Sequence, residues 1–193
     1  NRDIWIDGNL IEGLQLDMHA GQRVHISHNT LRGGVLTAGI AIVSGRDGLT
    51  IEDYLISGNL IDSPVGSGIG VSLDPASTNG GMMQRITITD NVIRVGPQTT
   101  RGIYLGSTNN GTASSGNVMR DVSVLNNTIT VTDGNPRTYD ALIFGNNSVT
   151  ANIAFENWQI IGNVLRGNNT GRAIDVRRGV NALTTPNVVV GAL

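Results

Sequence analysis

An acidic residue and a histidine stand two positions apart near the start of the chain, at Asp17 and His19. In a β-strand, alternate side chains project from one face, so these two groups would lie about 7 Å apart. A carboxylate and an imidazole placed in this way can bind a polar group together and transfer a proton near neutral pH. The same residues would otherwise be solvated groups on a polar strand face, and the spacing alone does not decide between the two interpretations.

Other polar residues occupy equivalent places in a recurring short segment that reads small, apolar, any, apolar. The segment occurs at 13–16, 39–42, 68–71, 102–105, 141–144 and 173–176. Its third position, and the positions two and four residues later, belong to the same side of an alternating strand. On this basis the candidate catalytic residues are Asp17, His19, Asp74 and Tyr104, and the candidate substrate contacts are Gln15, Asp175 and Arg177.

A second repeated pattern accompanies these segments and is centred on an asparagine. Large apolar residues stand five and three positions before the asparagine and two positions after it, in six copies centred on Asn9, Asn29, Asn59, Asn91, Asn127 and Asn163. The spacing of 20 to 36 residues between copies indicates a solenoid, a propeller or an array. Alternation before each asparagine is typical of a strand, and the apolar residue after it points inward only if the chain bends there.

Each period therefore holds three short strands and three turns, and no helical periodicity occurs. Such periods, wound and stacked on one another, predict an all-β parallel β-helix of about six coils, rising by roughly 30 Å in all. The inward residues would form aliphatic columns that no single coil could bury alone. Trp5 falls at an outward strand position, where it could be a platform for stacking of a sugar or could pack under a further coil or loop. Tyr54 and Trp158 fall at inward positions and are predicted core residues.

The repeated asparagine fits a structural role better than a catalytic one. Asparagine tolerates left-handed backbone angles, so we expect it to occupy the bend itself. Its side-chain amide can also hydrogen-bond to the equivalent amide one coil above and one below, which predicts an asparagine ladder through the stack.

Composition narrows the classes of partner. The chain has 26 glycines, only 4% aromatic and 15% charged residues, and a net charge of −2 that argues against a nucleic-acid partner. No apolar stretch is long enough for a membrane span, and the absence of cysteine excludes disulfides and thiolate metal sites. We expect an extracellular or virion-surface protein. Residues 1–193 form one domain by this reading, and the repeats at both ends lack caps, as in a fragment of a longer β-helix.

Asparagine-centred frames such as those at 56–61 and 88–93 resemble the right-handed parallel β-helix superfamily of pectate lyases, polygalacturonases, alginate epimerases and phage tailspikes. The resemblance implies that the small-apolar-any-apolar segment is the first strand of each coil and that a polysaccharide lies in a groove over it. Residues 17–19 are similar at two of three positions to the Asp-Pro-His motif of alginate epimerases, although Met18 replaces the proline and Leu14 replaces the preceding tyrosine. This likeness implies that Asp17 and His19 hold a sugar carboxylate and move the C5 proton, assisted by Tyr104 or Arg177.

Three functions are compatible with these observations. The first is a carbohydrate-active enzyme, a lyase or C5-epimerase acting on an acidic polysaccharide. The second is a tailspike or adhesin segment that binds a surface glycan, either as a homotrimer or against further β-helix coils. The third is a purely structural β-solenoid. No cofactor is expected, although the resemblance to pectate lyases leaves room for Ca²⁺.

Overall fold

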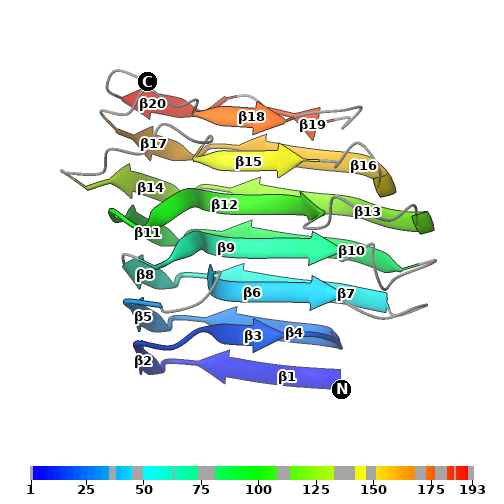
Figure 1. Ribbon diagram of the computed structural model, residues 1–193, viewed down its shortest axis with the longest axis horizontal. Coiled ribbons are helices and arrows are strands. Elements are labelled where there is room, and N and C mark those ends of the chain that lie inside the picture. Colours follow the sequence, from blue (N-terminus) through cyan, green and yellow to red (C-terminus); the bar gives the residue numbers. More distant parts are fainter. Residues whose placement is uncertain are drawn as a thin grey trace.

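The computed structural model describes residues 2–34, 38–44, 50–62, 64–73, 81–107, 114–132, 142–146, 151–167, 173–176, 182–184 and 186–190. Within these residues every regular element is a β-strand, and each strand pairs in parallel with the strand three places later in the chain. The strands stack into three long sheets, with the two termini at opposite ends of the stack (Figure 1). The predicted all-β parallel β-helix is therefore confirmed.

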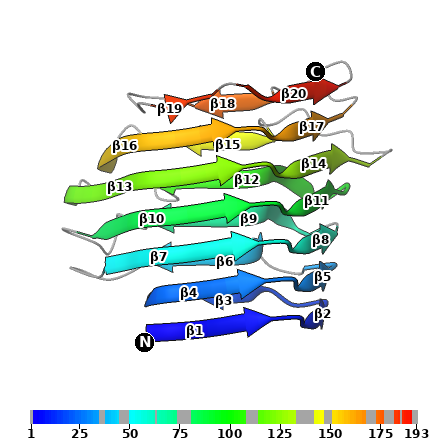
Figure 2. The same ribbon diagram turned by 180° about the vertical axis from the view of Figure 1, so that it is seen from behind.

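One strand of every coil belongs to each sheet. Sheet A holds β1 (Arg2–Asp7), β4 (Gly21–Ser27), β7 (Thr50–Ser57), β10 (Met82–Thr89), β13 (Ser114–Leu125), β16 (Ala151–Ile161) and β19 (Ala182–Leu183). Sheet B holds β2 (Leu10–Glu12), β5 (Thr30–Arg32), β8 (Leu60–Asp62), β11 (Val92–Val95), β14 (Thr128–Val131), β17 (Val164–Arg166) and β20 (Val188–Val190). Sheet C holds β3 (Leu16–Met18), β6 (Ala38–Ser44), β9 (Gly66–Leu73), β12 (Thr99–Ser107), β15 (Ile143–Asn146) and β18 (Ile174–Val176). Sheet C faces the viewer in Figure 1, and sheet A does so in Figure 2.

Apolar columns fill the interior, as the repeat predicts. The residues five and three before each ladder asparagine, and two after it, are register partners from coil to coil. From the second coil to the sixth they are all fully buried, and Tyr54 and Trp158 are among them at 1% exposure. Ile4, Ile6 and Ile11 of the first coil are partly buried against the same cluster.

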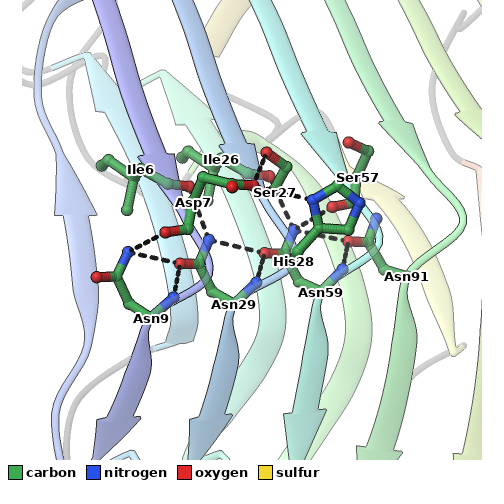
Figure 3. A network of polar contacts seen from close by, with 10 residues as sticks. All are labelled: Ile6, Asp7, Asn9, Ile26, Ser27, His28, Asn29, Ser57, Asn59 and Asn91. Atoms are coloured by element: carbon green, nitrogen blue, oxygen red, sulfur yellow. Dashed lines mark hydrogen bonds and ion pairs between the residues drawn. The ribbon is translucent and has the colours of Figure 1, made fainter.

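The predicted asparagine ladder is present. From Asn29 onwards, the Oδ1 atom of each ladder asparagine accepts hydrogen bonds of 2.9–3.0 Å from the backbone N–H and the Nδ2 group of the asparagine one coil earlier. The Nδ2 group of Asn29 also donates to the carbonyl of Ile6, and the later coils repeat this contact (Figure 3). Asn187 extends the ladder beyond the six copies visible in the sequence.

The prediction that the ladder asparagines themselves adopt left-handed backbone angles is wrong. The left-handed residue is the one before each asparagine, with φ between 53° and 71°, and these residues are Gly8, His28, Gly58, Asp90, Asn126 and Gly162. That residue makes the bend, which leaves the asparagine's own N–H and side-chain amide both directed at the next coil's Oδ1. Asparagine is thus selected here for its amide and not for its tolerance of left-handed angles.

A second left-handed column was not predicted. It lies six residues before each ladder asparagine, with φ of 54–59°, at Asp3, Arg23, Asp53, Arg85, Asp121 and Asn157. The regular pairing of sheet A skips these residues, so each strand carries an aligned bulge there. The bulge allows Ile51 and Tyr54, three positions apart, both to face the core.

Steric contact explains the small first residue of the repeated sheet C segment. A Cβ added to Gly68 would lie 2.5 Å from the Cγ2 atom of Ile93 and 2.5 Å from the carbonyl oxygen of Gly102. Gly39 and Gly102 meet equivalent obstacles, each from an isoleucine and a carbonyl oxygen of the next coil. This close approach positions the following apolar residues of sheet C over the core.

Candidate functional site

Asp17 and His19 lie side by side at the outer surface of the first coil, where β3 ends. The Nε2 atom of His19 is 3.1 Å from the Oδ2 atom of Asp17, and the side chains are 67% and 39% exposed. Leu16 on the opposite face of β3 is buried, which fixes Asp17 outward by strand alternation. The pair offers a solvent-facing carboxylate oxygen and an imidazole nitrogen held in one geometry.

Tyr104 stands far from this pair. The outward column of sheet C runs by register through Asp17, Ala41, Gly70, Tyr104, Phe144 and Asp175. Tyr104 is three strands away from Asp17, which is about 14 Å at ordinary strand spacing. It is also buried, at 7% exposure, with the guanidinium of Arg101 4.8 Å from its ring centroid. The structure therefore does not bring Tyr104 to the acid and base that it was expected to assist.

Of the remaining candidates, the structure describes Gln15 and Asp175. The Oε1 atom of Gln15 accepts a 3.3 Å hydrogen bond from the backbone N–H of Ala38, so Gln15 links the first coil to the second. Asp175 is buried on β18, five strands and roughly 24 Å from Asp17. Asp74 and Arg177 lie outside the described residues. Asp17 and His19 are thus the candidates that the structure shows in direct contact with one another.

A second Asp–His pair lies on sheet A and was not predicted. The Oδ1 atom of Asp7 is 2.9 Å from the Nδ1 atom of His28 and accepts a 2.7 Å hydrogen bond from the Ser27 hydroxyl (Figure 3). The hydrogen bond from Ser27, followed by that from His28, lowers the pKa of Asp7. Asp7 and Ser27 both stand two residues before a ladder asparagine, which places them in one column and is the signal that could have revealed the pair.

An aromatic contact lies beside that pair. Trp5 and His25 are register partners on the outward face of sheet A, and their rings stack with centroids 4.1 Å apart. Trp5 is 69% exposed, so its predicted outward position is confirmed. The side chain of His28 is 73% exposed, and both His25 and His28 have specific partners.

Neither a metal-binding cluster nor a membrane-spanning helix is present in the described part of the chain. No three of its His, Asp or Glu side chains gather in a way that could hold a metal ion. Nor does any helix there have the length and apolar character needed to cross a membrane. Comparison of the chain with models of known protein families, with curated proteins and with solved structures gave no match.

Proposed function

We propose that this protein binds a polysaccharide at the outer face of the first coil on sheet C, through Asp17 and His19. The observation that carries the proposal is the exposed, hydrogen-bonded Asp17–His19 pair on that face. A carboxylate accepts hydrogen bonds from sugar hydroxyls, while the imidazole can donate one and accept another. Because the two groups already contact each other, less side-chain freedom is lost when a ligand binds.

An acidic glycan is the ligand class that suits the pair best. Protonated His19 can donate to a uronate carboxylate, whereas neutral His19 can accept the C5 proton of the same sugar. Proton abstraction would begin a lyase or C5-epimerase reaction, which also needs a group that stabilises the developing charge on the carboxylate. Tyr104 is too distant to do so, and this finer activity would need a cation or a hydrogen-bond donor beside the pair. Binding is the part of the proposal that the described geometry supports.

The experiment compares two Asp–His pairs of the same chain. Binding to alginate, polygalacturonate and a neutral glucan is measured by calorimetry for the parent protein, for Asp17→Asn and His19→Ala, and for Asp7→Asn and His28→Ala as matched controls. We expect at least a tenfold loss of affinity for an acidic glycan in the first two variants and little change in the controls. Ultraviolet absorbance of an unsaturated product in the same samples reports lyase activity separately. Equal losses in all four variants, or no binding by the parent, would refute the assignment.

A purely structural solenoid is the second candidate, and one observation favours it. Many outward charged side chains on sheets A and B contact a neighbouring coil, as in Arg23–Asp3 and Arg85–Asp53. A surface whose charges stabilise the stack itself is what a spacer or fibre segment requires. Failure to bind any glycan in the panel would leave this function as the better explanation.

A further inference from the structure

Most inward positions of this β-helix do not distinguish one coil from the next, although Tyr54 and Trp158 are large exceptions in one column. Ile26, Ile56 and Ile88 occupy one column, and the ladder presents the same amide in every coil. A stack displaced by one coil would therefore bury similar aliphatic columns and rebuild the same ladder. Whatever makes the native order of coils more stable must lie among residues that differ from coil to coil.

Two outward columns differ in a regular way, because the sign of their charge alternates. The first is the left-handed column of sheet A, which reads Asp3, Arg23, Asp53, Arg85, Asp121 and Asn157. The second lies on sheet B, three residues after each ladder asparagine, and reads Glu12, Arg32, Asp62, Arg94, Thr130 and Arg166. In neither column do two like charges stand in adjacent coils.

Direct contacts join neighbouring coils along these columns. Arg23 binds Asp3 in a two-pronged arrangement, with Nε–Oδ1 at 2.5 Å and a second nitrogen–oxygen distance of 2.7 Å. Arg85 binds Asp53 in the same way at 2.5 and 3.1 Å, and it also donates to Glu52 at 2.7 Å. On sheet B the corresponding ion pairs are looser, at 3.9 Å for Arg32–Glu12 and 3.6 Å for Arg94–Asp62.

In the sheet A column, charged residues also interact with charges outside their own ion pair. The pKa of Arg23 is raised mainly by its hydrogen bond with Asp3, but the charge of Asp53 in the coil on its other side contributes in the same direction. The pKa of Asp53 is lowered chiefly by its hydrogen bond with Arg85 and also by the charge of Arg23. Arg23 and Asp53 are thus each attracted by a charge in the coil before and by one in the coil after.

The backbone supports a specific role for these side chains. A left-handed conformation is unfavourable for most residues other than glycine, and asparagine and aspartate tolerate it best. Arginine nevertheless occupies it at Arg23 and Arg85, with φ of 54° in both. Glycine would fit these bulges without strain but would remove the guanidinium that spans the coils.

We propose that the alternating charges form a register code that specifies which coil stacks on which. The code has a period of two coils: displacement by one coil sets Asp3 beside Asp53 and Glu12 beside Asp62. Displacement by two coils sets Asp3 beside Arg85 and Glu12 beside Arg94, which restores attraction. Native order is thereby distinguished from its nearest competitor, a stack slipped by a single coil.

The first test exchanges one pair in the full chain. The variant Asp3→Arg/Arg23→Asp keeps one aspartate and one arginine at the two left-handed positions and preserves their attraction. Its new aspartate, however, faces Asp53. If the column is continuous, the urea midpoint falls below that of the parent at low ionic strength, and the difference shrinks as added salt screens the repulsion. An unchanged midpoint at every salt concentration would show that the pairs are independent and would overturn the proposal.

The second test removes whole coils at register-matched positions. Gly21, Ile51 and Met83 are register partners, so deletion of 21–50 removes one coil and deletion of 21–82 removes two. Asp3→Arg/Glu12→Arg is then introduced into both deletions and into the full chain. We expect it to raise the urea midpoint after the one-coil deletion and to lower it in the other two. The same direction of change in all three would overturn the proposal, and if the deletions do not fold, the pair exchange decides.

Discussion

Replacing Tyr54 with phenylalanine should stabilise the protein. Tyr54 is 1% exposed between the aliphatic side chains of Val24 and Ile86, and its hydroxyl has no hydrogen-bond partner among the described residues. It presses against the backbone of the second coil, where a Cβ on Gly21 would lie 2.8 Å from the phenolic oxygen. An unsatisfied buried polar group costs about 1–3 kcal/mol. Removing one oxygen leaves a small void that costs well under about 1 kcal/mol, so we expect a net gain of about 1–2 kcal/mol.

The measurement is unfolding by urea and by heat. A gain of this size would raise the melting temperature by roughly 2–8 °C for a chain of this length. The matched control is Trp158→Phe in the same inward column, because the indole N–H of Trp158 donates to the carbonyl of Met119 at 3.3 Å. That variant loses both a satisfied hydrogen bond and volume, so it should destabilise by roughly 1–4 kcal/mol. Destabilisation by Tyr54→Phe would refute the reasoning, since it would mean that the hydroxyl is satisfied.

The pH dependence of stability at alkaline pH tests the same hydroxyl group independently. Burial raises the pKa of Tyr54 from 10.0 to about 12. The unfolded chain therefore releases this proton above about pH 10, while the folded protein still holds it. The contribution of Tyr54 is complete below pH 10, and stability falls by about 1.4 kcal/mol per pH unit as the pH rises towards 12. Tyr54→Phe should remove this part of the alkaline loss.

Three further predictions concern the ladder, the sheet C glycines and the outer acids. Asn91→Ala removes an acceptor for two buried donors of the preceding coil and should destabilise the protein by about 2–5 kcal/mol. Asn9→Ala, at the exposed end of the ladder, should change the urea midpoint much less. Gly68→Ala should destabilise by about 1–3 kcal/mol through overpacking, whereas Gly70→Ala, where an added Cβ meets nothing nearer than 3.6 Å, should be nearly neutral in thermal unfolding. Hydrogen bonding to arginine lowers the pKa of Asp53, so its stabilisation is present above the unfolded pKa and is lost as the pH falls through the folded value; acid titration of Asp53→Asn should show a smaller loss than the parent.

The fold could be predicted from the sequence because only stacked coils explain the residues of the repeat. Large apolar residues at fixed distances from an asparagine can all be buried only if the coils stack, and the asparagine amide supplies the connection. The left-handed column of sheet A escaped prediction because it also contains Arg23 and Arg85, and arginine does not signal positive φ. Their conformation follows from the need to turn two residues, such as Ile51 and Tyr54, to the same side of one strand.

The candidate site was predictable only where it is local. Asp17 and His19 contact each other because they are two residues apart on one strand. Tyr104 stands at the same position of its own coil, but equivalence in the repeat implies separation by whole coils and not proximity. Asp7 and His28 show the converse, since they are 21 residues apart and meet because their coils are adjacent. Contacts of this kind follow from register, which a sequence pattern gives only after the coils have been aligned.

The outer faces of the solenoid differ in what their polar side chains bind, and this difference bears on function. On sheets A and B, charges such as Arg23 and Arg85 reach across to the adjacent coil, so replacing them changes the stack. On sheet C, Asp17 contacts His19 of its own coil, whereas the neighbouring Gln15 accepts a coil-to-coil hydrogen bond from the backbone N–H of Ala38. The contact between Asp17 and His19 is therefore not one that joins two coils. Replacing either residue should disturb the stack less than replacing Arg23 or Arg85, so the proposed binding role of the pair can be tested without loosening the solenoid.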